Sequence, residues 1–276
     1  MATYRAGRPQ PGTPPRSPAP SASADHPWQD VVTTTSSLAP RALALRTLPD
    51  TLPRPEAGVP QMWVQHVRDQ SAAELAAGYE LLDTEERRRA NAFVRQELRD
   101  RYVAAHTALR RLLGAYLEQD PGKVEFVREP CPLCTKPHGR PAVAGRPTPP
   151  LHFSLSHSDE LAVLAFADRP VGADVERFPG SSTVEEVAGS LHPRERAELA
   201  MLPQDRRPAA FARVWARKEA HLKGTGAGVG GGLDGHYLGI GPLPVDPPGW
   251  TLTDLAVDSG YAACVAVASS APPPGR

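Results

Sequence analysis

The chain has 276 residues, enough for one large domain or two small ones. Its 31 lysines and arginines balance its 31 aspartates and glutamates, so no overall charge favours nucleic acid or a membrane surface. No apolar run has the length of a membrane span, and the N-terminus lacks the apolar segment of a secretory signal. Because 3 cysteines cannot form a closed set of disulfides, we expect a reducing, cytoplasmic location.

The two ends of the chain are poor in large apolar residues. Residues 1–58 are rich in proline, serine, threonine and alanine, and residues 270–276 include three consecutive prolines. Such segments bury too little apolar surface to offset the entropy cost of ordering them. The composition therefore predicts a disordered leader over 1–58 and a disordered tail over 270–276. A proline-rich docking segment is the alternative interpretation of the leader.

Arginine-rich helices are predicted at the start of the ordered region. A short strand is expected at 62–67, followed by helices at 72–82, 84–93 and 96–118. The last two helices carry a dense set of basic side chains: Arg87, Arg88, Arg89, Arg95, Arg99, Arg101, Arg110 and Arg111. Most helical arginines only form a solvated face. The guanidinium group also matches phosphate oxygens with paired donors, so this density suggests a phosphate site.

The segment CPLCTKPHGRP follows a short strand predicted at 123–127. Its Cys131, Cys134 and His138 have the spacing of zinc ligands, but three ligands are one short of a closed structural site. We therefore favour a loop with incidental thiols over a bound zinc ion. The tight turn that follows presents Arg140, next to Pro141, to an anion.

Three short strands are predicted between residues 151 and 176. Ser156 and His157 end the first of them, and Asp174 and Glu176 end the third. Side chains two residues apart project from the same face of a strand, so the two acids point the same way. A histidine in a strand is more often structural than catalytic. The nearby carboxylates and arginines favour a substrate contact for His157.

A helix predicted over 211–224 carries a third acid. Glu219 and Lys223 are one turn apart and therefore share a face. A generic amphipathic helix would explain this pattern as well. Together with Asp174 and Glu176, however, Glu219 completes a set of oxygen ligands suited to a hard cation such as Mg²⁺. A further helical region at 183–202 precedes this helix, and a hairpin of two strands at 250–257 and 261–269 follows it.

These motifs together resemble the 4'-phosphopantetheinyl transferases of the Sfp type. The resemblance covers about residues 62–268 and rests on GRP, FSLSHS, VGADVE and FARVWARKEAHLKGTGAG, in that order. It implies an α+β fold made of two similar halves related by a pseudo-twofold axis, with coenzyme A in the cleft between them. We expect the halves to span 59–170 and 171–269, with the break near Pro170.

The resemblance also implies roles for individual residues. It makes Asp174, Glu176 and Glu219 the ligands of Mg²⁺, with Mn²⁺ as an alternative ion. Its contacts to coenzyme A fall on Ser156, His157, Arg140, Pro141, Lys218 and Lys223, with Arg89 and either Arg87 or Arg88 on the 3'-phosphate. This chain departs from the family pattern at Glu86, where a relative can carry a basic residue, and in its CPLC insertion.

The implied reaction moves 4'-phosphopantetheine from coenzyme A to a serine of an apo acyl or peptidyl carrier protein, as in polyketide and nonribosomal peptide biosynthesis. Glu219, directly or through a metal-bound water, is the candidate base; Lys223 is expected to stabilise or protonate the leaving phosphate, and His157 to hold the pyrophosphate or the 3'-phosphate. A monomer without nucleic-acid or membrane partners is expected. The alternatives are a Mg²⁺-dependent pyrophosphate hydrolase and a zinc-supported nucleic-acid-binding module, and the zero net charge argues against the second.

Overall fold

The computed structural model of the protein describes residues 38–269. Residues 1–37 of the expected leader and the expected tail over 270–276 lie outside this range. The α-helices are α1 (Ala72–Leu81), α2 (Thr84–Ala92), α3 (Gln96–Leu117), α4 (Ser181–Val187), α5 (Pro193–Met201) and α6 (Arg207–Thr225). Short 3-10 helices span Leu45–Thr47, Val67–Asp69, Pro121–Lys123, Ala188–Ser190, Gln204–Arg206 and Gly228–Gly231. Between residues 38 and 269, no helix has the length and apolar character needed to cross a membrane.

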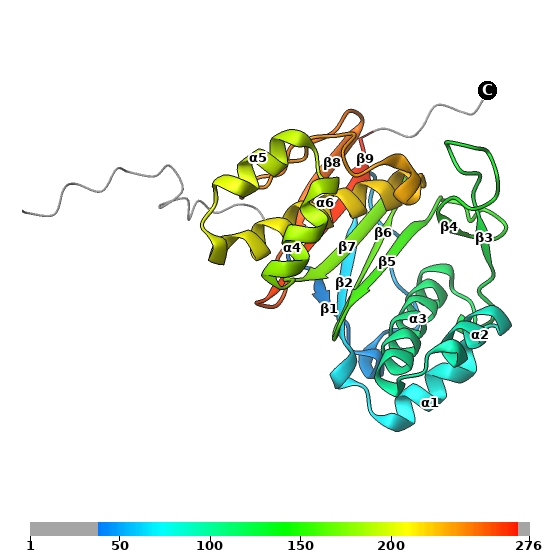
Figure 1. Cartoon of the computed structure of the whole chain (residues 1–276). Helices are drawn as coiled ribbons and strands as arrows, with labels where there is room; N and C mark the ends of the chain where they lie inside the picture. The colour runs from blue at the N-terminus through cyan, green and yellow to red at the C-terminus, as the bar shows by residue number, and fades with distance from the viewer. Residues whose placement is uncertain (1–37, 270–276) are drawn as a thin grey trace, which may run out of the picture. The chain divides into compact units, whose positions relative to one another are not determined.

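The strands form two main sheets and one small hairpin (Figure 1). They are β1 (Arg41–Ala42), β2 (Gln61–His66), β3 (Phe126–Arg128), β4 (Pro141–Val143), β5 (His152–Ser158), β6 (Leu161–Ala167), β7 (Val171–Arg177), β8 (Trp250–Leu255) and β9 (Tyr261–Ala268). The first sheet has the order β1-β2-β6-β5 and the second β7-β9-β8, while β3 pairs with β4. All pairs are antiparallel except β1 with β2. The protein is therefore an α+β protein, as the sequence predicts.

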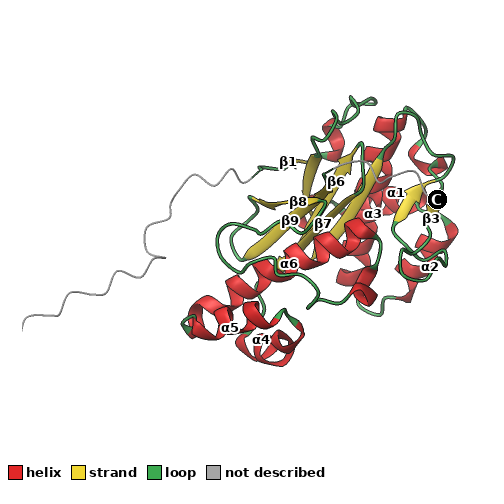
Figure 2. Cartoon of the chain, turned by 90° about the horizontal axis from the view of Figure 1, so that it is seen from above, coloured by secondary structure: helices red, strands yellow, loops and turns green. Residues whose placement is uncertain are grey.

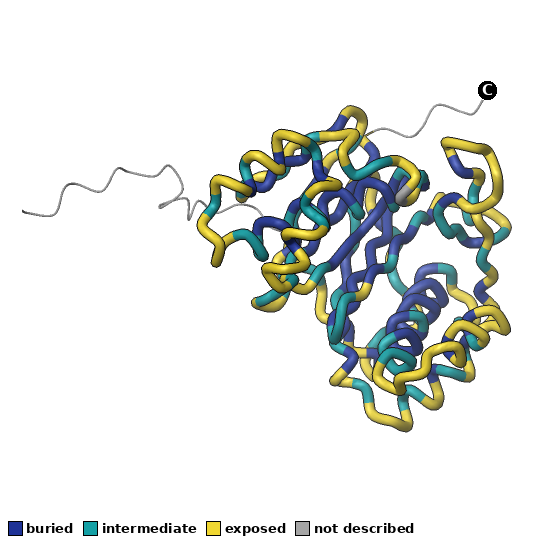
Figure 3. The backbone as a smooth tube through the Cα atoms, in the orientation of Figure 1, coloured by how far each residue is buried: buried dark blue, intermediate teal, exposed yellow. Residues whose placement is uncertain are grey.

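Each of the two main sheets is covered on one face by a long helix (Figure 2). Leu109, Leu112 and Leu113 of α3 pack with Phe153 and Phe166 of the first sheet. In the second sheet, α6 packs on β7 and β9. The remaining faces of the two sheets form a shared core, in which alternate residues of β6 meet alternate residues of β7 and β9. Strand β6 is buried along its whole length, because both of its faces are covered (Figure 3).

Helix boundaries follow from local capping signals. Ser71 with Glu74 and Asp83 with Glu86 form capping boxes at α1 and α2, and His192 caps α5 in the same way. In each box, a side chain accepts a hydrogen bond from a backbone N–H that would otherwise lack a partner. The helical region predicted over 183–202 consists of α4 and α5, and the second of these starts at Pro193 behind its cap, His192.

The edges of the two sheets are joined through serines of β5. Ser154, Ser156 and Ser158 alternate along the strand and therefore point to one side. The Ser154 Oγ accepts a hydrogen bond from the Ala173 N–H (2.9 Å), and the Ser158 Oγ accepts one from the Arg177 N–H (3.1 Å). These side chains replace the missing backbone ladder between β5 and β7. The alternation of serines in FSLSHS thus has a structural reason.

The expected disorder of residues 38–58 is wrong. Strand β1 pairs with β2, opposing Arg41 to Trp63, and Leu38 forms a bridge with Leu255. The side chains of Leu43 and Leu45 are buried against the core of the first sheet. The average composition of this segment hides its few leucines, which pack in one cluster with α3 and the first sheet.

Glycine at two positions allows α6 to lie directly on the second sheet. A Cβ on Gly172 of β7 would overlap the backbone of α6 at Ala220 and Gly224. A Cβ on Gly224 would in turn overlap the ring of Trp250. Larger residues would push the helix away from the strand, and with it the side chains of α6 that face β7.

We expect Gly172→Ala to lower the stability of the protein by more than about 3 kcal/mol, the upper range for overpacking, because the obstructing atoms are backbone. Thermal unfolding followed by circular dichroism measures this loss. Gly189→Ala is the matched control, since a Cβ there meets nothing within 4 Å. Equal melting temperatures for the two variants would contradict the close packing of α6 on β7.

We expect Leu45→Ala to destabilise the protein by about 2–5 kcal/mol, the usual cost of truncating a buried leucine. The control Val59→Ala changes an exposed side chain directly after this segment and should cost less than about 0.5 kcal/mol. Urea unfolding of the full chain gives both values. A Leu45→Ala variant as stable as the control would show that the segment before residue 59 contributes nothing to the core.

Candidate active site

Two acids of β7 and two charged residues of α6 meet above the second sheet. Asp174 lies on the same face of β7 as Gly172, the face that α6 covers. The Lys223 ammonium donates hydrogen bonds to Asp174 Oδ1 (2.6 Å) and to Ser156 Oγ (2.8 Å). The Ser156 hydroxyl donates to the same carboxylate oxygen (2.7 Å). Strand β5, strand β7 and helix α6 thus each contribute one member of a hydrogen-bonded triangle.

Burial and mutual repulsion make the carboxyl groups difficult to ionise. Burial raises the pKa of Asp174, while the charge and hydrogen bond of Lys223 oppose this effect. Burial, together with the charges of Asp174 and Glu219, raises the pKa of Glu176 to about 7. Burial and the charge of Asp174 also raise the pKa of Glu219. An additional positive charge beside these groups would therefore be stabilised strongly.

The three acids fit a divalent cation by their chemistry. Asp174, Glu176 and Glu219 offer the oxygen donors that hard cations prefer. The second oxygen of Asp174, Oδ2, is buried without a hydrogen-bond partner, which is an expensive state for a carboxylate. The carboxylate oxygens are not gathered into one coordination sphere. Among residues 38–269, three potential ligand atoms lie within 4.8 Å of one another only at Cys131, Cys134 and His138.

A cavity of about 890 Å³ opens beside Lys223. This volume is in the range of sites for cofactor-sized ligands. Its walls come from α2 and α3, from the β3–β4 hairpin with its connecting loop, and from the end of α6 with the turn that follows. The charged residues on these walls are Asp83, Glu85, Glu86, Arg89, His106, Arg128, His138, Arg140 and Lys223. Lys223 thus lines the cavity and also contacts Asp174, which together with Glu176 and Glu219 we call the carboxylate cluster.

Three arginines line the cavity. Arg89 is exposed, and its Nε donates to Glu85 (3.0 Å). Burial and the neighbouring charge of Arg89 lower the pKa of Arg128, which indicates two guanidinium groups close together. Arg140 donates to Glu129 (2.6 Å) and to the carbonyl oxygen of Gly224 in α6 (2.7 Å). Arg128 is not among the site residues predicted from the sequence, because its only signal there is a basic residue in a short strand beside the GRP turn.

Arg87 has a different role from the one expected. Its guanidinium donates to the carbonyl oxygens of Leu82 (2.9 Å) and Glu80 (2.6 Å), and the side chain does not line the cavity. Arg207 of α6 makes the matching bonds to Leu202 (3.0 Å) and Ala200 (2.9 Å). Both arginines therefore satisfy carbonyl groups at the end of a preceding helix.

Lys218 and Glu86 are also used for packing. Lys218 is buried and lies 2.8 Å from Glu195, and it donates to the carbonyl oxygen of His236 (2.6 Å). Glu86 accepts from Arg110 of α3 (2.6 Å) while it caps α2, and His106 contacts its other oxygen (2.9 Å). An acid at position 86 is thus required by the buried arginine, which explains this departure from the family pattern.

Of the remaining residues expected to contact coenzyme A, Pro141 lines the cavity, whereas Ser156 and His157 do not. Pro141 begins β4 and lines the cavity beside Arg140. Ser156 is buried in the triangle with Asp174 and Lys223 and does not line it. His157 is exposed at the end of β5, next to Ser156, and is not part of the wall either.

Comparison with known proteins identifies one family. The model of the 4'-phosphopantetheinyl transferase superfamily matches residues 170–253. The chain is 35% identical to 4'-phosphopantetheinyl transferase HetI of Nostoc sp. over 209 residues, which is 72% of this chain and 84% of that protein. It is 26% identical to 4'-phosphopantetheinyl transferase Sfp of Bacillus subtilis, over 68% of this chain and 88% of that protein. It is 31% identical to 4'-phosphopantetheinyl transferase gsp of Aneurinibacillus migulanus, over 47% of this chain and 53% of that protein.

We expect the affinity of the protein for a divalent cation to rise as the pH increases through about 7, because below this pH a proton occupies Glu176 and competes with the cation. Titration with Mn²⁺, followed by electron paramagnetic resonance at a series of pH values, measures the effect. Glu176→Gln should weaken binding and flatten the pH dependence near 7, whereas Glu185→Gln, at an exposed position of α4, should leave both unchanged. An affinity of the unaltered protein that is independent of pH in this range would exclude Glu176 from the cation site.

Proposed function

The chain belongs to the 4'-phosphopantetheinyl transferase superfamily, and from this membership we propose that it transfers 4'-phosphopantetheine from coenzyme A to a serine of an apo acyl or peptidyl carrier protein. The observation that carries this proposal is the position of Lys223. This residue lines a cavity large enough for a cofactor and contacts the carboxylate cluster at Asp174. A substrate in the cavity can therefore reach the acids with its phosphates.

We assign the cavity to coenzyme A. Its volume of about 890 Å³ and the arginines Arg89, Arg128 and Arg140 on its walls support binding of a large anionic nucleotide. We assign Mg²⁺ to Asp174, Glu176 and Glu219, with Mn²⁺ as an alternative. When bound, the cation neutralises negative charge on the pyrophosphate oxygens.

The reaction exchanges one phosphorus–oxygen bond for another. The serine oxygen of the carrier protein bonds to the phosphorus that bears pantetheine, and the bond from this phosphorus to the bridging pyrophosphate oxygen breaks. The bridging oxygen leaves with its electron pair as part of adenosine 3',5'-bisphosphate. Such transfer depends mainly on positioning and charge neutralisation.

Glu219 acts on the attacking serine, and Lys223 acts on the leaving phosphate. We assign Glu219 as the base that accepts the serine proton, because burial and the charge of Asp174 raise its pKa and so make its carboxylate a stronger base. The Lys223 ammonium, held by Asp174 and Ser156, is available to the leaving phosphate. His157, exposed beside Ser156, is assigned to contact a phosphate of the substrate.

We propose that the two halves, 59–170 and 171–269, are related by a pseudo-twofold axis, with the break near Pro170. The matching bonds of Arg87 and Arg207 support this relation, as do the long helices α3 and α6, each packed on one antiparallel sheet. Both halves contribute to the cavity walls. One chain therefore supplies a whole site, and we propose that the enzyme acts as a monomer in the cytoplasm without binding nucleic acid.

The direct test is a mass spectrum of an apo carrier protein after incubation with this protein, coenzyme A and Mg²⁺. We expect the carrier to gain one phosphopantetheine group on serine. Release of adenosine 3',5'-bisphosphate without carrier, with no gain in carrier mass, would identify a pyrophosphate hydrolase instead.

We expect Asp174→Ala to abolish transfer while the protein stays folded, because this residue is the shared partner of Lys223, Ser156 and the cation. Product formation at saturating Mg²⁺ measures the loss. The control Asp205→Ala removes an exposed carboxylate from a 3-10 helix and should keep full activity. Turnover of Asp174→Ala close to that of the control would remove Asp174 from the reaction.

We expect Arg89→Ala to raise the KM for coenzyme A by about tenfold to hundredfold, since a charge-assisted hydrogen bond contributes about 1.5–3 kcal/mol. The KM for dephospho-coenzyme A should change much less, because that substrate lacks the 3'-phosphate. Arg88→Ala is the matched control, since Arg88 lies in the same helix, pairs with Glu85 and does not line the cavity. An equal effect of Arg89→Ala on both substrates would assign Arg89 to the surface of α2.

A further inference from the structure

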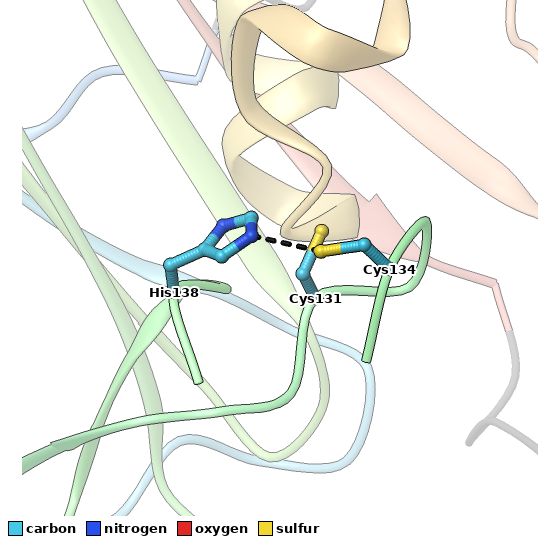
Figure 4. Close-up of side chains that lie close together, drawn as sticks. All are labelled: Cys131, Cys134 and His138. Atoms are coloured by element: carbon cyan, nitrogen blue, oxygen red, sulfur yellow. Dashed lines mark hydrogen bonds between the residues drawn. The ribbon is translucent and has the colours of Figure 1, made fainter. Parts of the chain in front are cut away.

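The loop between β3 and β4 brings two thiols and an imidazole together. The ligand atoms of Cys131, Cys134 and His138 all lie within 4.8 Å of one another. Figure 4 shows the three side chains pointing toward one point from a single loop, with the Cys134 Sγ 2.9 Å from the His138 Nε2. Cys131 is buried, and the other two are exposed. The loop thus places two sulfur donors and one nitrogen donor around one point.

The backbone of the loop is folded around the first sulfur. The Thr135 N–H donates to the Cys131 carbonyl oxygen (2.8 Å), and the Cys131 N–H donates to that of Lys136 (2.8 Å). Thr135 adopts a positive φ of 62°, a conformation that a β-branched residue adopts only when its surroundings require it.

Two thiolates with an imidazole are a typical ligand set for zinc. Sulfur and imidazole donors select zinc over magnesium or calcium, and the charges of two thiolates balance a divalent ion. We propose that Cys131, Cys134 and His138 bind one Zn²⁺ ion, with solvent in the fourth tetrahedral position. The sequence alone favours incidental thiols, because a fourth protein ligand is missing. Convergence of the three ligand atoms outweighs that objection, since three protein ligands and solvent also form a stable zinc site.

Zinc would act here on the wall of the cavity. Cys131, Leu133, Cys134 and His138 all line it, and Arg140 follows His138 by two residues. A Cβ at Gly139 would meet the carbonyl oxygen of Glu129 at 2.6 Å, so the chain between His138 and Arg140 is closely packed. A metal that fixes His138 therefore also fixes Arg140. This second consequence rests on the proposed function, whereas zinc binding itself does not.

The test is to measure zinc in the full chain, purified under reducing conditions, by mass spectrometry of the metal content. We expect about one zinc ion per chain. A chelator should remove this ion, and added zinc should restore it. Substituted Co²⁺ should show the thiolate charge-transfer band and the visible bands of tetrahedral coordination. Zinc-loaded protein should also melt at a higher temperature than stripped protein, because an ion that binds only the folded state stabilises it.

Variants of the loop separate the ligands from their neighbours. Cys134→Ser and His138→Gln should each weaken zinc binding by more than about 100-fold, because loss of a residue that only hydrogen-bonds to a metal ligand already costs about 10- to 100-fold. Lys136→Gln changes an exposed charge in the same loop and should bind zinc normally. Both ligand positions are exposed, so these variants should fold, and circular dichroism of the stripped proteins checks this.

Two results would overturn the proposal. One is zinc uptake by the reduced protein no greater than that of a Cys131→Ser/Cys134→Ser double variant. The other is equal zinc affinity in His138→Gln and Lys136→Gln.

Removal of zinc should raise the KM for coenzyme A more than it lowers kcat. A protein that modifies a carrier but takes up no zinc would refute only the zinc site, and a protein that binds zinc but modifies no carrier would refute only the proposed function.

Discussion

The active-site arrangement depends on the contact between Gly172 of β7 and the backbone of α6. Because position 172 has no side chain, the helix lies directly on the strand. The next residues on that face, Asp174 and Glu176, then come within reach of Glu219 and Lys223. The carbonyl oxygen of Gly224, at the end of the same helix, accepts a hydrogen bond from Arg140. One close contact therefore connects the carboxylate cluster with the opposite wall of the cavity.

Buried charges elsewhere in the molecule are paired. Arg110 of α3 contacts Glu86, Lys218 of α6 contacts Glu195, and Arg217 contacts Asp254. Breaking such a pair leaves an uncompensated buried charge, which is strongly destabilising. The carboxylate cluster differs from these pairs, because Lys223 provides one positive charge for three acids. This local excess of negative charge explains the raised pKa values of the acids and favours a cation.

The same chemical group serves structure at one position and substrate binding at the next. Arg87 and Arg89 lie in one helix, yet Arg87 donates to carbonyl groups at the end of α1, and Arg89 faces the cavity. Arg207, at the start of α6, makes the corresponding bonds although it does not belong to the arginine-rich helices α2 and α3. This repeat of the same bonds indicates that the role of Arg87 is structural. Comparison within the chain thus distinguishes arginines that composition alone treats as equivalent.

The sequence by itself determined the α+β class, the long helices, the three strands before Arg177 and the choice of Asp174, Glu176, Glu219 and Lys223 as one group. Hydrophobic periodicity, glycine and proline signals and ordered motifs are local, and local signals suffice for these features. It did not determine that residues 38–58 belong to the core, nor that Arg87 and Lys218 are structural, nor that Arg128 lines the cavity. Only the tertiary structure decided these points, because each depends on partners distant in sequence: α3 for Leu45, Glu195 for Lys218, and Arg89 for Arg128. The convergence of Cys131, Cys134 and His138 was also decided only by the structure, although these residues are close in sequence: their spacing permits a metal site, and the fold of the loop brings the three ligand atoms together.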